Sequence, residues 1–398
     1  MGHPWEQRKL RNISELITGG TPNTKRDDYW SPPEIPWMAS GEINKKLINQ
    51  PSRYISKLGF ENSSSKWVPK NSVLIALAGQ GKTRGMCAYT TIPITINQSL
   101  AAVVPNSLVN PKFLLYDLER RYEDLRAMSS GDVTRGGLNK ALLADLTVNL
   151  PSLKEQTRIG EIFRDLEDLI TLHQRKLDLL KEKKKGLLQK MFPKPGENKP
   201  ELRFSGFTDP WKQRKISELF KITRGNVLAA NKTEAFKSNE DPYPVYSSQT
   251  KNNGLMGYYK DYLYENAITW TTDGANAGTV NYRSGKFYCT NVCGVLLAKE
   301  IQPCLMVAER LNSVTKDYVS YVGNPKLMNN VMADININLP WQEEERQKMS
   351  DLFAMVDDLI TLHQRKLDLL KEKKKGLLQK MFPKPGQQEP ELRFSEFR

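Results

Sequence analysis

Two loops in the first part of the chain concentrate side chains that can bind phosphates and bases. One is AGQGKTRG, at residues 78–85, and the other is GDVTRGG, at residues 131–137. Lysine and arginine suit phosphates or guanine, and glutamine suits adenine. A solvated turn favours the same residue types, and this plainer interpretation stays open. The candidate DNA-binding residues in these loops are Gln80, Lys82, Thr83, Arg84, Thr134 and Arg135.

Two loops in the second part of the chain have similar chemistry but different sequences. They are YSSQTKNNG, at residues 246–254, and WTTDGANAGTVNYRSGK, at residues 270–286. Hydroxyl, amide and charged groups on such loops can bond to base edges or to phosphates, so we predict DNA contacts here too. The candidates are Ser248, Gln249, Lys251, Thr272, Asp273, Asn276 and Arg283.

Motifs that would support catalysis are incomplete. GKT, at residues 81–83, would need a glycine at position 76 to form a phosphate-binding loop, but that residue is Ala76. The sequence EKK, at residues 182–184, imitates a nuclease motif but lies in a lysine-rich helical stretch. The four cysteines form no CxxC pair, which argues against a zinc site. We therefore predict no catalytic residue, no metal ligand and no cofactor in this chain.

The composition favours a polyanionic partner. Lysine and arginine number 59 against 45 aspartate and glutamate residues, giving a formal net charge of +14. A surplus of this size suits nucleic acid or an acidic membrane surface. No apolar run approaches the roughly 18 residues of a membrane span, and the first residues lack the apolar stretch of a signal peptide. We expect a cytoplasmic protein, and the charge alone favours a nucleic-acid partner only slightly over the plain alternative of solubility.

Two dissimilar segments, at about residues 14–148 and 218–337, must position the candidate loops. Each contains short apolar runs, such as SVLIALAG and CGVLLA, separated by turns rich in glycine, asparagine and proline. Such runs are typical of strands, and each segment closes with helical sequence. We predict two α+β domains of like fold that present unlike surfaces.

A repeated helix accompanies each of these domains. Residues 169–196 recur letter for letter at residues 359–386, and apolar residues recur there at alternating steps of three and four. This period is typical of a coiled-coil seam, so the two helices are predicted to pack antiparallel on each other. Ser152 followed by Glu155 predicts a capped start for the first helix. The seam residues are Phe163, Leu166, Ile170, His173, Leu177, Leu180 and Leu187 in the first helix, and Phe353, Val356, Ile360, His363, Leu367, Leu370 and Leu377 in the second.

Shorter duplications show how the two halves are connected. PELRFS occurs at residues 200–205 and 390–395, and WxQRK occurs at residues 5–9 and 211–215. Their order describes a cycle of two repeats that is opened inside one repeat, so the two chain ends are predicted to lie close together. The predicted fold is α+β with a pseudo-twofold axis. The predicted divisions are a first domain at 1–150, a helical spacer at 151–194, a second domain at 195–338, a second helical spacer at 339–384 and a tail at 385–398 that packs near the N-terminus.

This arrangement resembles the DNA-specificity subunit of type I restriction-modification systems over essentially the whole chain. NLPSLKEQTRIGEIF, at residues 149–163, and LLKEKKKGLLQKMF, at residues 179–192, are similar to the family's helical spacer. The second spacer opens with LPWQEEERQKMSDLF, at residues 339–353, which departs from the pattern by one inserted residue and lacks its EQ pair.

The resemblance implies that each domain is a target recognition domain that reads one half of a bipartite site in the major groove of double-stranded DNA. It implies that the helix pair sets the distance between the halves and docks two methyltransferase subunits. Those subunits would carry S-adenosylmethionine and methylate adenine, and restriction subunits that use ATP and Mg²⁺ would join them. Two alternatives stay open: a coiled-coil scaffold without DNA specificity, and a stand-alone nucleic-acid enzyme.

Overall fold

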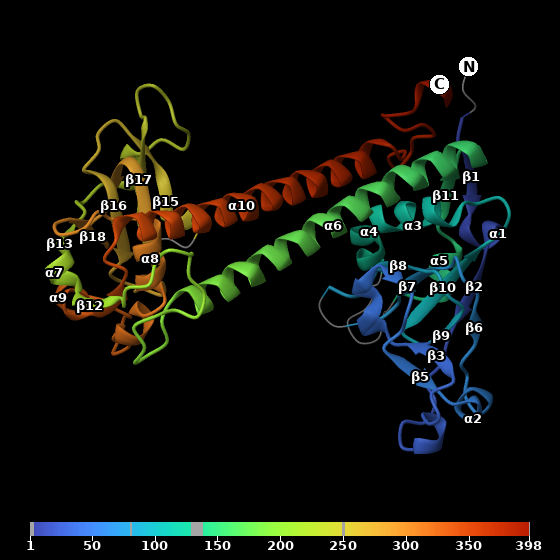
Figure 1. Ribbon diagram of the computed structural model, residues 1–398. Coiled ribbons are helices and arrows are strands. Elements are labelled where there is room, and N and C mark those ends of the chain that lie inside the picture. The colour runs from blue at the N-terminus through green and yellow to red at the C-terminus, as the bar shows by residue number, and fades with distance from the viewer. Residues whose placement is uncertain (1–3, 80–81, 129–137, 249–250, 398) are drawn as a thin grey trace. The chain divides into compact units, whose positions relative to one another are not determined.

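The computed structural model describes residues 4–79, 82–128, 138–248 and 251–397. Two compact units make up the chain (Figure 1): unit 1 is Met1–His173 together with Lys366–Arg398, and unit 2 is Gln174–Arg365. The long helices α6 (Leu153–Met191) and α10 (Glu343–Lys380) each contribute to both units. Each half of a long helix packs on the core of one unit.

Unit 1 is built around a five-stranded sheet with strand order β2-β10-β7-β8-β4. A second sheet has the order β5-β3-β9-β6, and β1 pairs with β11 immediately before α6. All four residues of β7 are buried, as are all four of β8, which accounts for the continuous apolar runs in the sequence. The strands are β1 (Glu6–Lys9), β2 (Ser14–Thr18), β3 (Ile35–Met38), β4 (Leu47–Ile48), β5 (Arg53–Ile55), β6 (Trp67–Val68), β7 (Val73–Ala76), β8 (Cys87–Thr90), β9 (Ile94–Ile96), β10 (Leu100–Pro105) and β11 (Thr147–Leu150).

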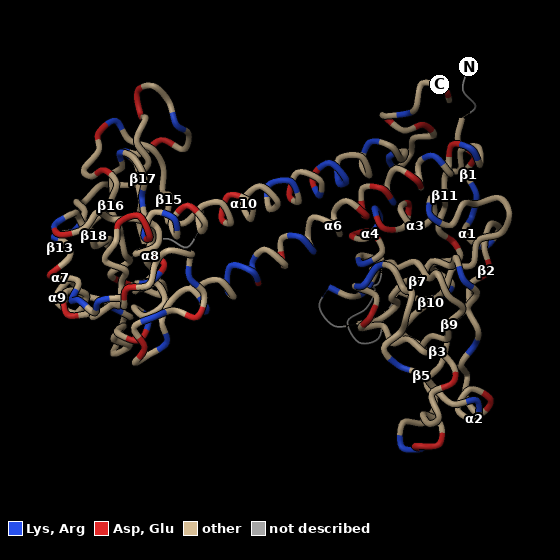
Figure 2. The backbone as a smooth tube through the Cα atoms, viewed as in Figure 1, with Lys and Arg blue, Asp and Glu red and all other residues tan. Residues whose placement is uncertain are grey.

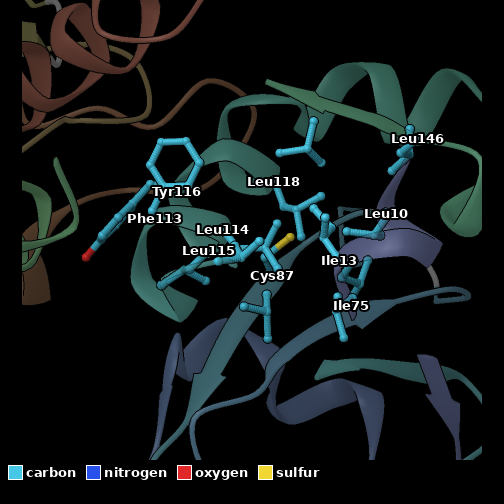
Figure 3. Packing of buried hydrophobic residues seen from close by; sticks show 14 of the residues in the cluster. Leu10, Ile13, Ile75, Cys87, Phe113, Leu114, Leu115, Tyr116, Leu118 and Leu146 are labelled. Atoms are coloured by element: carbon cyan, nitrogen blue, oxygen red, sulfur yellow. The ribbon is translucent and has the colours of Figure 1, made fainter. Parts of the chain in front are cut away.

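One face of the five-stranded sheet carries the main core of unit 1 (Figure 3). Ile75 of β7 and Cys87 of β8 lie there beside Leu114 and Leu118 of the helix α3, all of them buried. Burying a leucine side chain contributes on the order of 2 kcal/mol, so this layer fixes α3 on the sheet. The shorter helices of the unit are α1 (Leu10–Ile13), α2 (Lys57–Glu61), α3 (Pro111–Arg120), α4 (Tyr122–Ala127) and α5 (Lys140–Ala144).

Unit 2 repeats this topology. Its sheet has the order β13-β18-β16-β17-β14-β15, and the pair β12·β19 corresponds to β1·β11. In both units the fourth strand of the sheet, β8 or β17, pairs in parallel with the fifth strand, β4 or β14. The elements are β12 (Lys212–Lys215), α7 (Ile216–Leu219), β13 (Phe220–Arg224), β14 (Tyr243–Tyr246), β15 (Leu255–Tyr259), β16 (Tyr264–Thr271), β17 (Val280–Cys289), β18 (Cys293–Ala298), α8 (Leu305–Asn312), the 3₁₀ turn η5 (Thr315–Tyr318), α9 (Asn329–Asp334) and β19 (Asn336–Leu339).

The two units differ mainly at the periphery of the shared scaffold. Unit 1 adds the separate β5-β3-β9-β6 sheet, whereas unit 2 extends its central sheet with β15. The prediction of two α+β domains with like folds and unlike surfaces is therefore confirmed.

The long helices pack antiparallel within each unit. In unit 1, Phe163 near the start of α6 stacks on Phe382 just beyond the end of α10, with ring centroids 6.0 Å apart. In unit 2, Phe192 after the end of α6 contacts Phe353 near the start of α10 at 5.9 Å. Burial follows the predicted heptad period. Phe163, Leu166, Leu177, Phe353, Val356 and Leu367 are buried, and Ile170, His173, Leu180, Leu187, Ile360, His363, Leu370 and Leu377 are half-buried.

The chain ends of unit 1 meet at this helix pair. Trp5 makes an edge contact with Phe382, at 6.2 Å between ring centroids, and Phe394 packs against the same buried cluster. In unit 2 the corresponding residues, Trp211 and Phe192, make the same kind of contact at 6.1 Å. The C-terminal segment thus supplies to unit 1 what the linker after α6 supplies to unit 2. Within the described part of the chain, no helix has the length and apolar character that a membrane crossing requires.

Candidate nucleic-acid interface

The loops that follow β7 and β16 occupy equivalent places in the two units. Each joins two neighbouring antiparallel strands of the central sheet, β7 to β8 and β16 to β17. Lys82, Thr83 and Arg84 lie on the first loop, and Thr272, Asp273 and Asn276 lie on the second. The structure therefore brings two of the predicted loops, chosen separately, to one position of the shared fold.

The loop in unit 1 is braced by α4. The Tyr122 hydroxyl donates a hydrogen bond to the Lys82 carbonyl oxygen over 2.6 Å, and the Gly85 N–H donates to the Ala76 carbonyl oxygen over 2.9 Å. Gly79 has φ +155°, where a side chain would also meet Thr83. Lys82 is exposed, and Thr83 and Arg84 are half-exposed. Gln80, Thr134 and Arg135 lie outside the described residues.

We expect Tyr122→Phe to loosen this loop, because it removes the hydroxyl that holds Lys82. The loss of one hydrogen bond should cost about 0.5–1.5 kcal/mol. Hydrogen–deuterium exchange should accelerate at residues 82–86. The matched control is Tyr89→Phe, which removes a hydrogen bond of the same length to Asn71, at the other end of the β7–β8 hairpin, and should leave exchange at residues 82–86 unchanged. Unchanged exchange in the Tyr122 variant would show that α4 does not brace the loop.

Three loops of unit 2 are joined by hydrogen bonds into what we call the three-loop surface, formed by residues 246–248, 272–279 and 320–327. The Asn276 side chain donates to the Ser248 carbonyl oxygen over 3.2 Å. The Gly274 N–H donates to the Pro325 carbonyl oxygen, and the Leu327 N–H to the Thr272 carbonyl oxygen, each over 2.9 Å. Side chains from distant parts of the sequence are thereby presented together.

The third of these loops carries no residue that sequence reasoning selected. A signal was present, because NLP follows at a fixed distance from residues 131–137 in one half and from residues 320–326 in the other. The segment in unit 2 lacks the arginine that drew attention to GDVTRGG. Its position before α9 and β19 is nonetheless the counterpart of the position before α5 and β11.

Two of the predicted residues in unit 2 are used internally. Thr272 is 2 % exposed, with its hydroxyl 3.0 Å from the Val292 carbonyl oxygen. Arg283 is 8 % exposed, lies 3.7 Å over the Tyr246 ring and donates to the Asn253 carbonyl oxygen over 2.8 Å. Burial lowers the pKa of Arg283. These contacts position the loops around it.

The remaining candidates of unit 2 are closer to solvent. Ser248, Asp273 and Asn276 are half-exposed. Gln249 and the side chain of Lys251 lie outside the described residues. Lys316 of η5, which sequence reasoning missed, donates to the Ala277 carbonyl oxygen over 2.8 Å and braces this loop as Tyr122 braces its counterpart. In both units, therefore, the element after α3 or α8 holds the candidate loop.

A lysine on each long helix, buried at Lys374 and half-buried at Lys184, ties the sheet domain to the helix pair. In unit 1, Lys374 donates to Glu167 of α6 over 2.6 Å and to Glu119 at the end of α3 over 2.9 Å. In unit 2, Lys184 donates to Asp357 of α10 over 2.8 Å and to Glu309 of α8 over 2.7 Å. Each lysine therefore joins three helices, the two long helices and either α3 or α8.

The charges at these junctions stabilise one another. Burial raises the pKa of Glu119, but Lys46 and Lys374 outweigh it, and this pKa lies below the usual range. Burial lowers the pKa of Lys184, but hydrogen bonds with Asp357 and Glu309 outweigh it and leave this pKa raised. Unit 1 has a second cation at its junction, since Lys46 also donates to Glu119, over 2.6 Å.

Near the start of each long helix, an arginine binds a buried carboxylate. Arg393 donates to both oxygens of Glu155 in unit 1, each over 2.9 Å, and Arg203 donates to both oxygens of Glu345 in unit 2, over 2.7 and 2.8 Å. We call these two pairs the arginine latches. The Ser152 hydroxyl accepts a hydrogen bond from the Glu155 N–H, as the predicted cap requires, but the Glu155 carboxylate is held by Arg393.

The departure of the second spacer from the expected pattern is absorbed before its helix. Glu345 takes the place of Glu155, and Arg346 takes the place of Gln156. Gln156 donates to the Pro151 carbonyl oxygen over 2.9 Å, and Arg346 donates to the Pro340 carbonyl oxygen over the same distance. The inserted residue thus leaves this contact at the helix start in place.

The described residues contain no group of three histidine, cysteine, aspartate or glutamate side chains that could hold a metal ion. The cysteines at positions 87, 289 and 293 are buried free thiols, and burial raises the pKa of each, to about 11 for Cys293. A thiol in this state is mostly protonated at neutral pH and is a poor nucleophile.

Comparison with known proteins identifies the family. The family profile described as the type I restriction modification DNA specificity domain matches residues 3–182 and 208–372. A putative type I specificity subunit of Mycoplasma pneumoniae is 30 % identical over 221 residues, which cover 54 % of this chain and 85 % of that protein. The EcoR124I/EcoR124II specificity subunit of Escherichia coli is 27 % identical over 166 residues, 41 % of each chain.

A solved structure has the same fold. The crystal structure of a type I restriction-modification S subunit from M. genitalium superposes with a TM-score of 0.71 at 15 % identity, covering 96 % of both chains. Two matches to the family profile, in a chain whose two units share one topology, agree with this likeness. The chain therefore belongs to the family of type I restriction-modification DNA specificity proteins.

Proposed function

We propose that this chain is the DNA-reading subunit of a type I restriction-modification complex and performs no catalysis itself. Unit 1 and unit 2 each provide a target recognition domain that reads one half of a bipartite DNA site. The observation that carries the proposal is the pair of equivalent hairpin loops with unlike side chains. Lys82 and Arg84 on one loop suit guanine or phosphate, whereas Asp273 on the other suits the cytosine amino group.

The long helices act in this proposal as the spacer between the half-sites. A helix of 39 residues, as in α6, rises about 58 Å along its axis. One turn of DNA rises about 34–36 Å, so such a spacer suits half-sites that lie one to two turns apart. Lysines and arginines, blue in Figure 2, recur along both helices and over both units. They favour association with the phosphate backbone, in keeping with the net charge of +14.

The repeated helix surface docks two copies of a methyltransferase subunit. Core packing tolerates apolar replacements, so it does not require identical exposed residues in the two helices. Identical exposed leucines are nevertheless present, at Leu169, Leu172 and Leu179 in α6 and at Leu359, Leu362 and Leu369 in α10. Exposed apolar side chains repeated in this way suit a partner that binds twice. The methyltransferase subunits supply S-adenosylmethionine and adenine methylation, and restriction subunits supply ATP-dependent chemistry.

Methylation sequencing tests the proposal. Cells that contain the complete system should carry one bipartite methylated motif that disappears when this chain is removed. Inserting four residues, about one helical turn, into α6 should change the gap of that motif and preserve both half-sites. Inserting four residues between the exposed Gln387 and Gln388 is the matched control and should leave the gap unchanged. Altered half-sites in the α6 variant would contradict the role of the helices as a spacer.

A further inference from the structure

The turn at residues 320–326 of unit 2 presents two apolar side chains to solvent. Tyr321 is 67 % exposed and Val322 is 92 % exposed. Single exposed apolar residues are common on protein surfaces. Two consecutive ones at the tip of a turn that joins the three-loop surface require a closer look, because neighbouring residues of that surface are polar.

This turn is held in place on both sides. Ser320 and Lys326 exchange two backbone hydrogen bonds, each 2.9 Å long. The Pro325 carbonyl oxygen accepts from the Gly274 N–H, and the Trp270 indole N–H donates to the Leu327 carbonyl oxygen over 3.0 Å. Gly323 provides the positive φ of +76° that the tip requires. The tip is therefore presented on a fixed base, so less conformational entropy is lost when it makes a contact.

The polar side chains next to the turn define what it can meet. Lys326 lies 3.9 Å from Asp273, on the loop that is equivalent to the AGQGKTRG loop of unit 1. A carboxylate can accept from the cytosine amino group, and a lysine can bind a phosphate or guanine. An apolar tip within such a surface has one apolar counterpart in the major groove, the 5-methyl group of thymine.

The size of Val322 favours a methyl contact over insertion between base pairs. Side chains that wedge between base steps are commonly phenylalanine, leucine, isoleucine, methionine or proline. Valine is shorter and β-branched, with a restricted χ1 angle, which suits a fixed contact at a groove surface.

We propose that Val322 contacts the 5-methyl group of a thymine in the half-site read by unit 2, with Tyr321 covering the contact from solvent. The inference rests on the proposed function and adds a specificity-determining residue to it. It assigns to unit 2 a requirement for one thymine methyl group that polar loop residues do not account for.

Binding of the full chain, in complex with its methyltransferase partners, to duplexes that carry the methylated motif tests this. Each thymine of the motif is replaced in turn by deoxyuridine, which lacks only the methyl group. Wild type should bind about fourfold more weakly to one substituted duplex, a loss on the scale of one buried methyl group. Val322→Ala should bind the unmodified duplex more weakly by a similar factor and should be insensitive to deoxyuridine at that position. Val227→Ala, which shortens another exposed valine of unit 2, should keep the wild-type sensitivity.

The outcomes separate the two proposals. If wild type shows no preference for the motif over unrelated duplex, both the proposed function and this inference are overturned. If wild type prefers the motif but no deoxyuridine weakens binding, or if Val322→Ala stays as sensitive as wild type, only the inference is overturned. Because Val322 is almost fully exposed, its replacement should leave the thermal unfolding of the chain unchanged. An unchanged unfolding temperature would exclude misfolding as the cause of weaker DNA binding.

Discussion

Replacing Arg393 with methionine is expected to destabilise unit 1 by about 3–5 kcal/mol, because it leaves the Glu155 carboxylate buried without a cation. That side chain is only 1 % exposed, and Arg393 donates to both of its oxygens. Hydrogen–deuterium exchange measures the loss by region, and protection should fall in β1, β11 and α3 of unit 1. In chemical denaturation of the whole chain, the first unfolding transition should occur at a lower denaturant concentration.

Two further variants interpret that result. Arg203→Met removes the other arginine latch and should produce a loss of the same size in unit 2, since Glu345 is also 1 % exposed. The double variant Arg393→Met, Glu155→Met removes both charges and should recover most of the lost stability, because an apolar pair can replace a buried ion pair with little penalty. A loss below about 1 kcal/mol in the single variant, or no recovery in the double, would contradict this account of the latch.

The second large effect is expected at the helix junctions. Lys184→Met should destabilise unit 2 by about 3 kcal/mol, because Glu309 and Asp357 would lose the cation they share. Lys374→Met should cost less, about 2 kcal/mol, because Lys46 remains beside Glu119 in unit 1. Chemical denaturation combined with exchange in α8 and α3 measures both losses.

The pH dependence of the Lys184 contribution gives an internal check. Its pKa is raised in the folded chain, so the stabilisation is fully present below the ordinary value of 10.5 and is lost only as the pH rises through the raised value. The difference in the free energy of unfolding between wild type and Lys184→Met should therefore stay constant between about pH 6 and pH 9.

The comparison of the two lysine variants tests the role of Lys46. Equal losses of stability in the Lys184 and Lys374 variants would show that Lys46 does not substitute for the missing lysine.

The regular parts of the fold were accessible from sequence because local periodicity determines them. The seam from Phe163 to Leu187 keeps its heptad period through the helix, and burial in the structure follows it. The strands β7 and β8 follow from short apolar runs that turns interrupt. The extent of the compact units was not accessible in this way. It depends on long-range packing, such as that of Phe382 on Phe163, which no local pattern specifies.

The candidate interface was predictable only in part, for a different reason. Residue type identified the loop of Lys82 because lysine, arginine and glutamine gather there. It also selected Arg283, because residue type does not distinguish an arginine that braces a loop internally from one that contacts DNA. The turn of Val322 was missed because its apolar residues have no sequence signature of nucleic-acid binding. Only the hydrogen bonds that join it to the Thr272 loop reveal its place in the surface.

The latch at Arg393 has a consequence for synthesis on the ribosome. Unit 2 consists of one continuous stretch, Gln174–Arg365, whereas unit 1 needs Lys366–Arg398 as well. Domains of a nascent chain commonly fold in order of emergence, from the N-terminus onward. We expect the opposite order here, because unit 1 cannot complete its packing until residues 366–398 have been translated, whereas all of unit 2 precedes them.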